Sequence, residues 1–215
     1  MDKKHEILNA AFDIFSEKGY HLSVAELAKA VNIKTPSLYS HFESKDEIIE
    51  LVVRDEIERY YSFLKGKMLE VSSFSCKEAM KSLYGSVIDY FSKDKRLRFW
   101  RAVPFIQNQQ LKSISTQLIV DNDRNFKQQM EQCFSKGQSN GEIRPDVSPG
   151  ALRLYLCMIQ GVLDGMLLYP KELVNISDAD ELFEAYWDGI CVTDSDHHVP
   201  QNQRRAQKHH LKRRD

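Results

Sequence analysis

The 215-residue sequence lacks the short motifs that mark most enzymes and metal sites. It has no glycine-rich phosphate loop, no nucleophile elbow of the G-x-S-x-G type and no H-E-x-x-H zinc motif. The four cysteines lie far apart and form no C-x-x-C pair: Cys76, Cys133, Cys157 and Cys191. We therefore expect no enzyme activity, no cofactor and no metal, and we interpret the cysteines as reduced core residues.

Long apolar runs and a strong charge of one sign are also missing. We find no apolar segment of about 18 residues and no N-terminal signal segment, which predicts a cytoplasmic protein with no membrane partner. The net charge is −1, and residues 1–54 carry seven Lys and Arg against nine Asp and Glu. Any DNA binding must then depend on a few well-placed groups and on helix N-termini.

The sequence is rich in helical periodicity instead. Apolar residues recur at helical spacing from Ile7 to Phe15, and Gly19 follows as a stop signal. Ser23 and Glu26 have the spacing of a capping box, which marks the start of a second helix.

A third and a fourth helix follow closely. Asn32 tolerates the left-handed conformation of a tight turn, Thr35 is a good N-cap, and Pro36 fits the first helical turn. Ser44 and Glu47 form a second capping box that opens a long helix. Four helices within about 65 residues, with a short turn between the second and third, predict a helix-turn-helix head.

The rest of the chain is also predicted to be helical. Helical spacing continues from residue 76 to 190 without alternating strand patterns, and Ser148-Pro149 opens a helix that Pro170 ends. Residues 194–215 contain six Lys and Arg, three Asp and four His, and no aromatic residue. We interpret them as a basic, His-rich flexible tail, either natural or left over from cloning.

Three segments carry a family resemblance: residues 7–20, Leu27-Ala28 and residues 37–45, which reads Ser-Leu-Tyr-Ser-His-Phe-Glu-Ser-Lys. Together, over about residues 5–54, they resemble the N-terminal domain of TetR-type repressors. Residues 141–144 and 186–190 are more weakly similar to the ligand and dimerisation domain of that family. The sequence departs from the family pattern in two places. The link between Tyr20 and the second helix is one residue shorter than usual, and Pro36 stands where a small residue is common.

The resemblance implies an all-α fold in which a three-helix helix-turn-helix head is joined through a long fourth helix to a helical ligand-binding and dimerisation domain. We set the boundaries at 1–54 for the DNA-binding domain, 55–192 for the effector and dimerisation domain, and 193–215 for the tail.

The second helix of such a motif lies in the major groove, and its first residues meet base edges. The residues expected at DNA are Lys34, Thr35, Pro36, Ser37, Leu38, Tyr39, His41 and Lys45. The resemblance places Tyr39 and Lys45 on phosphates. Taken singly, Tyr39 is interpreted as a core aromatic residue, and Lys34 and Lys45 as solvated surface residues. Their combination on a capped short helix favours DNA contact.

Two copies of so small a head are needed to read a palindrome, which predicts a homodimer. The apolar faces of helices 149–169 and 178–191 are the expected interface, or else they pack within one subunit. The interface residues are predicted to be Leu152, Leu156, Ile159, Leu163, Met166, Phe183, Trp187 and Ile190.

By family analogy the remaining helices enclose a pocket for an unknown small-molecule effector. Candidate walls and polar groups are Tyr84, Phe99, Trp100, Arg101, Phe105, Phe126, Tyr155, Met158, Gln160, Asp164 and Tyr169. The sequence thus predicts a ligand-responsive repressor whose partner is a double-stranded DNA operator. The alternative is a protein-binding adaptor on the same fold that no longer reads DNA.

Overall fold

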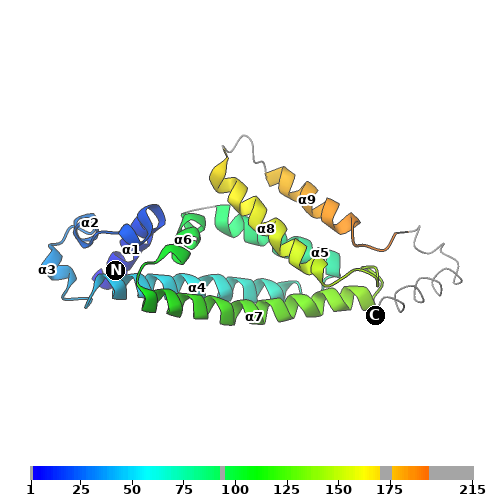
Figure 1. Ribbon diagram of the computed structural model, residues 1–215, viewed down its shortest axis with the longest axis horizontal. Helices are drawn as coiled ribbons and strands as arrows, with labels where there is room; N and C mark the ends of the chain where they lie inside the picture. Colours follow the sequence, from blue (N-terminus) through cyan, green and yellow to red (C-terminus); the bar gives the residue numbers. More distant parts are fainter. Residues whose placement is uncertain (1, 93–94, 170–175, 194–215) are drawn as a thin grey trace, which may run out of the picture.

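The computed structural model describes residues 2–92, 95–169 and 176–193 as an elongated helical molecule, which confirms the predicted all-α class (Figure 1). Most of the predicted tail, residues 194–215, lies outside the described residues. Within the described part, strand-like pairing is limited to one antiparallel bridge between Ile143 and Cys191. The α-helices and the two 3₁₀ turns (η) are α1 (Lys3–Lys18), η1 (Gly19–His21), α2 (Val24–Ala30), α3 (Thr35–Leu38), α4 (Lys45–Glu70), α5 (Cys76–Ser92), α6 (Arg96–Ala102), η2 (Val103–Phe105), α7 (Gln109–Ser139), α8 (Gly150–Leu168) and α9 (Ile176–Asp188).

Side-chain caps fix the start of the two longest helices. The Oγ of Ser44 accepts a hydrogen bond from the backbone N–H of Glu47 at 3.0 Å, which is the predicted cap of α4. Asn108 caps α7 in the same way, accepting from the N–H of Leu111 at 3.0 Å. Ser23 stands at the predicted start of α2, but its side chain makes no capping bond. Such caps satisfy amide groups that have no partner inside the helix.

Two residues in the left-handed region shape the head. Gly19 (φ 58°) ends α1, and Asn32 (φ 54°) turns the chain between α2 and α3. These are the stop and the turn that the sequence predicted. Helix α3 begins one residue earlier than expected, because Lys34 and not Thr35 is its N-cap.

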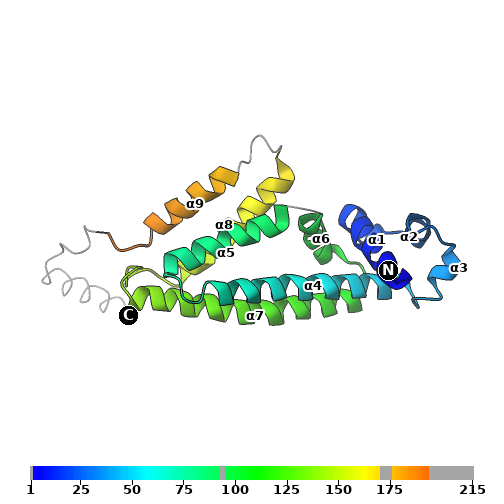
Figure 2. The same cartoon turned by 180° about the vertical axis from the view of Figure 1, so that it is seen from behind.

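The long helices α4 and α7 lie side by side along the molecule, with α1 to α3 at one end and α5, α8 and α9 around the other (Figures 1 and 2). Helix α6 lies between these parts and packs on α1. Among the described residues, the buried ones form two clusters, one in the head and one in the body. Phe99 of α6, Val103 of η2, Ile106 directly after η2 and Leu111 of α7 belong to the head cluster, so the head core extends beyond residue 54.

Helix α8 corrects the expectation that no segment is long and apolar enough to cross a membrane. It has 19 residues and a mean hydropathy of 1.4, which meets the criteria of length and composition. It also contains Arg153 and Asp164, and it buries Tyr155 and Leu163 in the body core beside α5 and α9. We describe α8 as a packed helix of the body with one exposed apolar face.

Candidate DNA-binding surface and effector cavity

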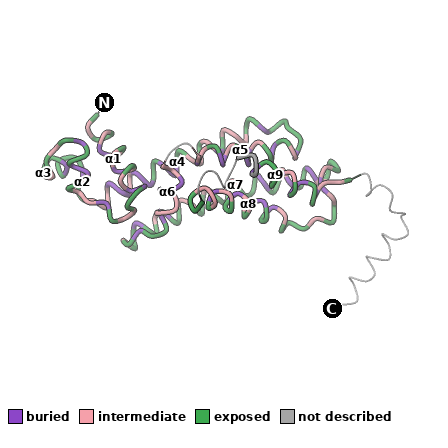
Figure 3. The backbone as a smooth tube through the Cα atoms, turned by 90° about the horizontal axis from the view of Figure 1, so that it is seen from above, coloured by how far each residue is buried: buried purple, intermediate pink, exposed green. Residues whose placement is uncertain are grey.

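Helix α3 lies at the far tip of the head (Figures 1 and 3). Six side chains around it are exposed or half-buried, and we call them the α3 surface: Lys34, Thr35, Pro36, Ser37, Tyr39 and His41. Tyr39 is 48% exposed, so its hydroxyl is available to a partner. The surface therefore presents an ammonium, three hydroxyl groups and an imidazole at one end of the molecule.

Leu38 does not belong to this surface. Its side chain is fully buried in the head core, in the same cluster as Leu27 and Phe42. The prediction that Leu38 reaches DNA is therefore wrong. A helix of four residues needs at least one apolar side chain to hold it on the head, and Leu38 has that role.

Lys45, at the first position of α4, is held in place by Tyr20. Its Nζ donates a hydrogen bond to the backbone oxygen of Tyr20 at 3.0 Å and lies 4.1 Å from the centre of the Tyr20 ring. The Tyr20 hydroxyl donates to Oδ1 of Asp46 at 2.7 Å, and this bond raises the pKa of Tyr20 to about 12. Lys45 is thus an oriented cation beside the exposed N–H groups of a helix start.

Helices α4, α5, α7 and α8 line a partly open cavity of about 360 Å³ in the body, which we call the effector cavity. Its volume falls within the range of small-molecule sites, about 300–1,000 Å³. Three predicted pocket residues line it: Phe126, Tyr155 and Gln160. The lining that the sequence reading missed is Tyr60, Leu64, Leu83, Val87, Asp123, Arg124, Lys127, Leu156 and Ile159. Two of these, Leu83 and Val87, are spaced four residues apart on α5 and so share one face of that helix.

The other predicted pocket residues do not line this cavity: Tyr84, Phe99, Trp100, Arg101, Phe105, Met158, Asp164 and Tyr169. Phe105 and Tyr169 are 77% and 58% exposed. Tyr84 is buried in the body core, and Phe99 stacks on Phe12 in the head core with ring centroids 5.0 Å apart. The helical spacing of an aromatic residue is compatible with a position in a core, on a surface or in a cavity wall. Only the tertiary packing shows which of these positions it occupies.

Arg101 binds protein groups across the gap between α6 and α8. Its Nη2 donates to Oε1 of Gln160 at 2.9 Å and lies 2.7 Å from Oδ1 of Asp164. Gln160 also lines the effector cavity. Helix α6 is therefore tied to a cavity wall on one side and, through Phe99 on Phe12, to the head on the other.

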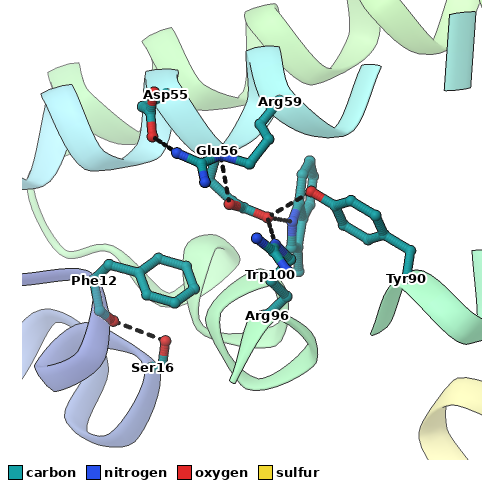
Figure 4. Close-up of polar contacts among 8 residues, drawn as sticks. All are labelled: Phe12, Ser16, Asp55, Glu56, Arg59, Tyr90, Arg96 and Trp100. Carbon is teal, nitrogen blue, oxygen red and sulfur yellow. Dashed lines mark hydrogen bonds and ion pairs between the residues drawn. The ribbon is translucent and has the colours of Figure 1, made fainter. Parts of the chain in front are cut away.

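A buried carboxylate joins α4, α5 and α6 (Figure 4). Glu56 is 3% exposed, and its Oε1 accepts hydrogen bonds from the hydroxyl of Tyr90 at 3.1 Å and from Nε1 of Trp100 at 3.3 Å. The guanidinium groups of Arg96 and Arg59 lie 3.2 and 3.8 Å from its two oxygens. Burial raises the pKa of Glu56, and the charge of Arg96 opposes that rise. Sequence reasoning missed this cluster.

Comparison with known proteins identifies the head. Residues 7–52 match the sequence family described as bacterial regulatory proteins, tetR family. The head is a TetR-family domain. IcaR of Staphylococcus aureus, described as a negative transcriptional regulator of the biofilm operon icaADBC, is 48% identical over 52 residues. IcaR of Staphylococcus epidermidis is 39% identical over 62 residues. These matches cover 24% and 28% of this chain, and 28% and 34% of the relatives.

The whole chain has the fold of TetR-type regulators. The ketosteroid transcriptional regulator KstR2 of Mycobacterium tuberculosis superposes with a TM-score of 0.68 over 89% of this chain and 96% of its own, at 18% identity. AibR, solved with isovaleryl coenzyme A and operator DNA, gives a TM-score of 0.67 over 85% and 96%, at 16% identity. At these identities the likeness concerns the fold alone.

In the body, six of the eight predicted interface residues are core residues: Leu152, Ile159, Leu163, Phe183, Trp187 and Ile190. Their side chains pack within one subunit, which is the alternative that the apolar spacing left open. Leu156 and Met166 are half-buried. The exposed apolar residues of α8 and α9 lie elsewhere on these helices: Leu154, Leu167, Leu168 and Leu182.

Proposed function

We propose that the chain is a cytoplasmic, homodimeric transcriptional repressor that binds a palindromic operator and leaves it when a small molecule fills the effector cavity. The observation that carries this proposal is the α3 surface. It combines hydrogen-bond donors at the tip of a TetR-family head with a buried anchor, Leu38, that fixes their orientation. IcaR, described as a negative regulator, supports repression, and the AibR complex with operator DNA and an acyl thioester supports a ligand-responsive regulator.

On DNA, the N-terminal end of α3 would meet the base edges of the major groove. Lys34 is suited to the O6 and N7 acceptors of guanine, and Ser37 to a base or a phosphate. Tyr39 and Lys45 would contact phosphates and set the orientation of the head, since backbone contacts position a protein without reading sequence. Thr35 and His41 flank this set and would contact the DNA backbone.

Two heads would bind half-sites about 34–36 Å apart, which requires a dimer. We place its interface on the exposed face of α8 and α9. Leu154 is 61% and Leu182 is 47% exposed, and Gly161 leaves open space where a side chain would stand. These features favour close approach of a second copy.

Release from DNA would follow from the contacts of α6. A ligand that draws Gln160 into the effector cavity competes with the bond from Arg101 to Gln160 and so loosens α6 from α8. Helix α6 carries Phe99, which packs on Phe12 of the head, so its movement would change the spacing of the two α3 helices. Such a ligand must bind the released conformer more tightly than the DNA-bound one.

The test is to incubate the purified full chain with fragmented DNA of its own genome, recover the retained fragments and sequence them. We expect a palindromic sequence to be enriched, and a gel shift with that sequence to be lost in a Lys34→Ala/Tyr39→Ala double variant. Failure of the folded wild-type protein to enrich any sequence would overturn the proposal and favour the adaptor alternative.

A further inference from the structure

The fold brings two of the four cysteines together. Cys76 is the first residue of α5 and Cys133 lies near the C-terminal end of α7, yet their Sγ atoms are 3.7 Å apart. We propose that Cys76 and Cys133 form a redox-modification site, at which a hydroperoxide oxidises the two thiols to a disulfide that links α5 to α7.

Gly137 allows α5 and α7 to lie close together beside the two thiols. Gly137 lies one helical turn after Cys133, and a Cβ at Gly137 would stand 2.7 Å from the Sγ of Cys76. Glycine at this position therefore lets the backbone of α7 approach Cys76 closely. A disulfide requires the two sulfurs to close from 3.7 Å to about 2.05 Å.

A small oxidant has space beside the two thiols. Cys76 and Cys133 both line a cavity of about 80 Å³, whose other walls include Ser72, Phe74 and Lys136. A cavity needs about 10–15 Å³ to hold one water molecule, so this one accommodates hydrogen peroxide. Cys133 is half-buried, and Ser72 and Phe74 are exposed at the surface. The site is thus a shallow cavity near solvent.

The surroundings of the two thiols differ, and this difference indicates which thiol attacks the peroxide and which one resolves. The contact with the Cys76 thiol lowers the pKa of Cys133, and the ammonium of Lys136 acts in the same direction, while burial and Glu142 oppose them. The contact with Cys133, burial and Glu142 raise the pKa of Cys76. Cys133 is half-buried whereas Cys76 is buried, so a peroxide reaches Cys133 first and Cys76 is the thiol that resolves.

The reaction balances with one peroxide. The Cys133 thiolate attacks one peroxide oxygen, the O–O bond breaks, and the departing hydroxide takes a proton to become water, leaving a sulfenic acid on Cys133. The Cys76 sulfur then attacks the Cys133 sulfur, the S–O bond breaks, and hydroxide leaves with the Cys76 proton as a second water. Two thiols lose two electrons and two protons, and the peroxide gains them.

The disulfide would connect two walls of the effector cavity, since α5 contributes Leu83 and Val87 and α7 contributes Phe126. Leu83 also lines the smaller cavity beside the cysteines. Oxidation would hold α5 and α7 together and slow the access of a ligand. This consequence rests on the proposed function, whereas the formation of the disulfide does not.

The experiment treats the reduced full chain with hydrogen peroxide, removes the excess with catalase, alkylates the remaining thiols and maps the digest by mass spectrometry. We expect a Cys76–Cys133 cross-linked peptide, with Cys157 and Cys191 alkylated, and full recovery of four alkylated thiols after reduction with dithiothreitol. The oxidised protein should also show a raised apparent Tm, because the cross-link restricts the unfolded chain.

Two variants separate the roles. Cys76→Ala should abolish the cross-link and leave Cys133 as a sulfenic acid that dimedone labels, and Cys133→Ser should abolish both the cross-link and the label. Cys157→Ser is the matched control and should cross-link like the wild type. Peroxide-treated wild type in which Cys76 and Cys133 are both alkylated, or in which Cys133 is oxidised without any cross-link to Cys76, would overturn the proposal. Neither result bears on operator binding, which the genomic selection tests separately.

Discussion

The Nε of Arg96 lies 3.2 Å from Oε1 of Glu56, and these side chains are only 22% and 3% exposed. A buried ion pair is stable only when further hydrogen bonds satisfy its remaining polar atoms. Tyr90 and Trp100 supply such bonds to the carboxylate (Figure 4). The junction of α4, α5 and α6 is thus a polar cluster next to the aromatic contact of α6 with the head.

This junction predicts a pH dependence of stability. The folded pKa of Glu56 is raised, so between the ordinary glutamate value of 4.5 and the folded value the native state binds more protons than the unfolded state. The stabilisation that Glu56 contributes is therefore fully present below its unfolded pKa, and it is lost as the pH rises through its folded pKa. We expect the unfolding free energy of wild type, minus that of Glu56→Gln, to fall as pH rises above 4.5.

Urea unfolding followed by circular dichroism measures this difference, at a series of pH values from about 4, near the ordinary glutamate pKa, to about 8. Glu58→Gln, on the exposed side of the same helix, controls for the loss of one negative charge. A difference curve that rises with pH would show that the ion pair with Arg96 outweighs burial.

Substitution of Lys34 tests the α3 surface. Lys34 is exposed and its side chain makes no capping hydrogen bond at the start of α3, so Lys34→Ala should leave the fold intact. We expect weaker operator binding and a salt slope, log Kd against log salt concentration, that is smaller by about 1. Fluorescence anisotropy at several salt concentrations measures both quantities. Lys65→Ala on the exposed side of α4 should behave like the wild type, and equal slopes for all three proteins would contradict the assignment.

Leu38 and Tyr39 should separate stability from DNA binding. Leu38→Ala removes a fully buried side chain and should lower the unfolding free energy by about 2–5 kcal/mol. Tyr39→Ala changes a side chain that is 48% exposed and should alter stability by at most about 0.5 kcal/mol while weakening operator binding. Chemical unfolding and gel shift measure the two effects. If Leu38→Ala keeps wild-type stability but no longer binds DNA, Leu38 contacts DNA and its assignment to the head core is wrong.

The exposed face of α8 should control the oligomeric state. Leu154→Glu places a charge at a residue that is 61% exposed in one subunit, so it should yield folded monomers by light scattering. Leu163→Arg instead forces a charge into the body core and should unfold the protein. Val120→Glu, at an exposed apolar residue of α7, is the matched control and should remain dimeric. Dimers that persist in Leu154→Glu would place the interface on another face.

The helices of the head could be predicted because short-range interactions determine where they start and end. Gly19 and Asn32 adopt left-handed conformations that few other residues tolerate, and Ser44 caps α4 through a bond to a residue three positions away. These interactions lie within a few residues in sequence. The same reading placed Lys34, Ser37 and Tyr39 around a short helix, where they are exposed.

The body was less predictable because apolar spacing shows that a face is buried without showing what covers it. Leu163 and Phe183 were assigned to a second subunit, but α5 and neighbouring helices of the same subunit cover them. Glu56 carried a signal that sequence reasoning passed over, since it is a carboxylate four residues after the buried Val52 on the apolar side of α4.

The amino-acid sequence by itself determined that the chain is helical and which polar groups surround α3, and it placed the starts of α2, α3 and α4 to within one residue. Short-range backbone preferences and caps decide these features. Only the tertiary structure decided which apolar faces meet, that Glu56 would be buried between two arginines, that Gln160 would join a cavity to α6, and that Cys76 would lie against Cys133. Contacts of this kind join helices separated by tens of residues, and their formation depends on how whole helices pack.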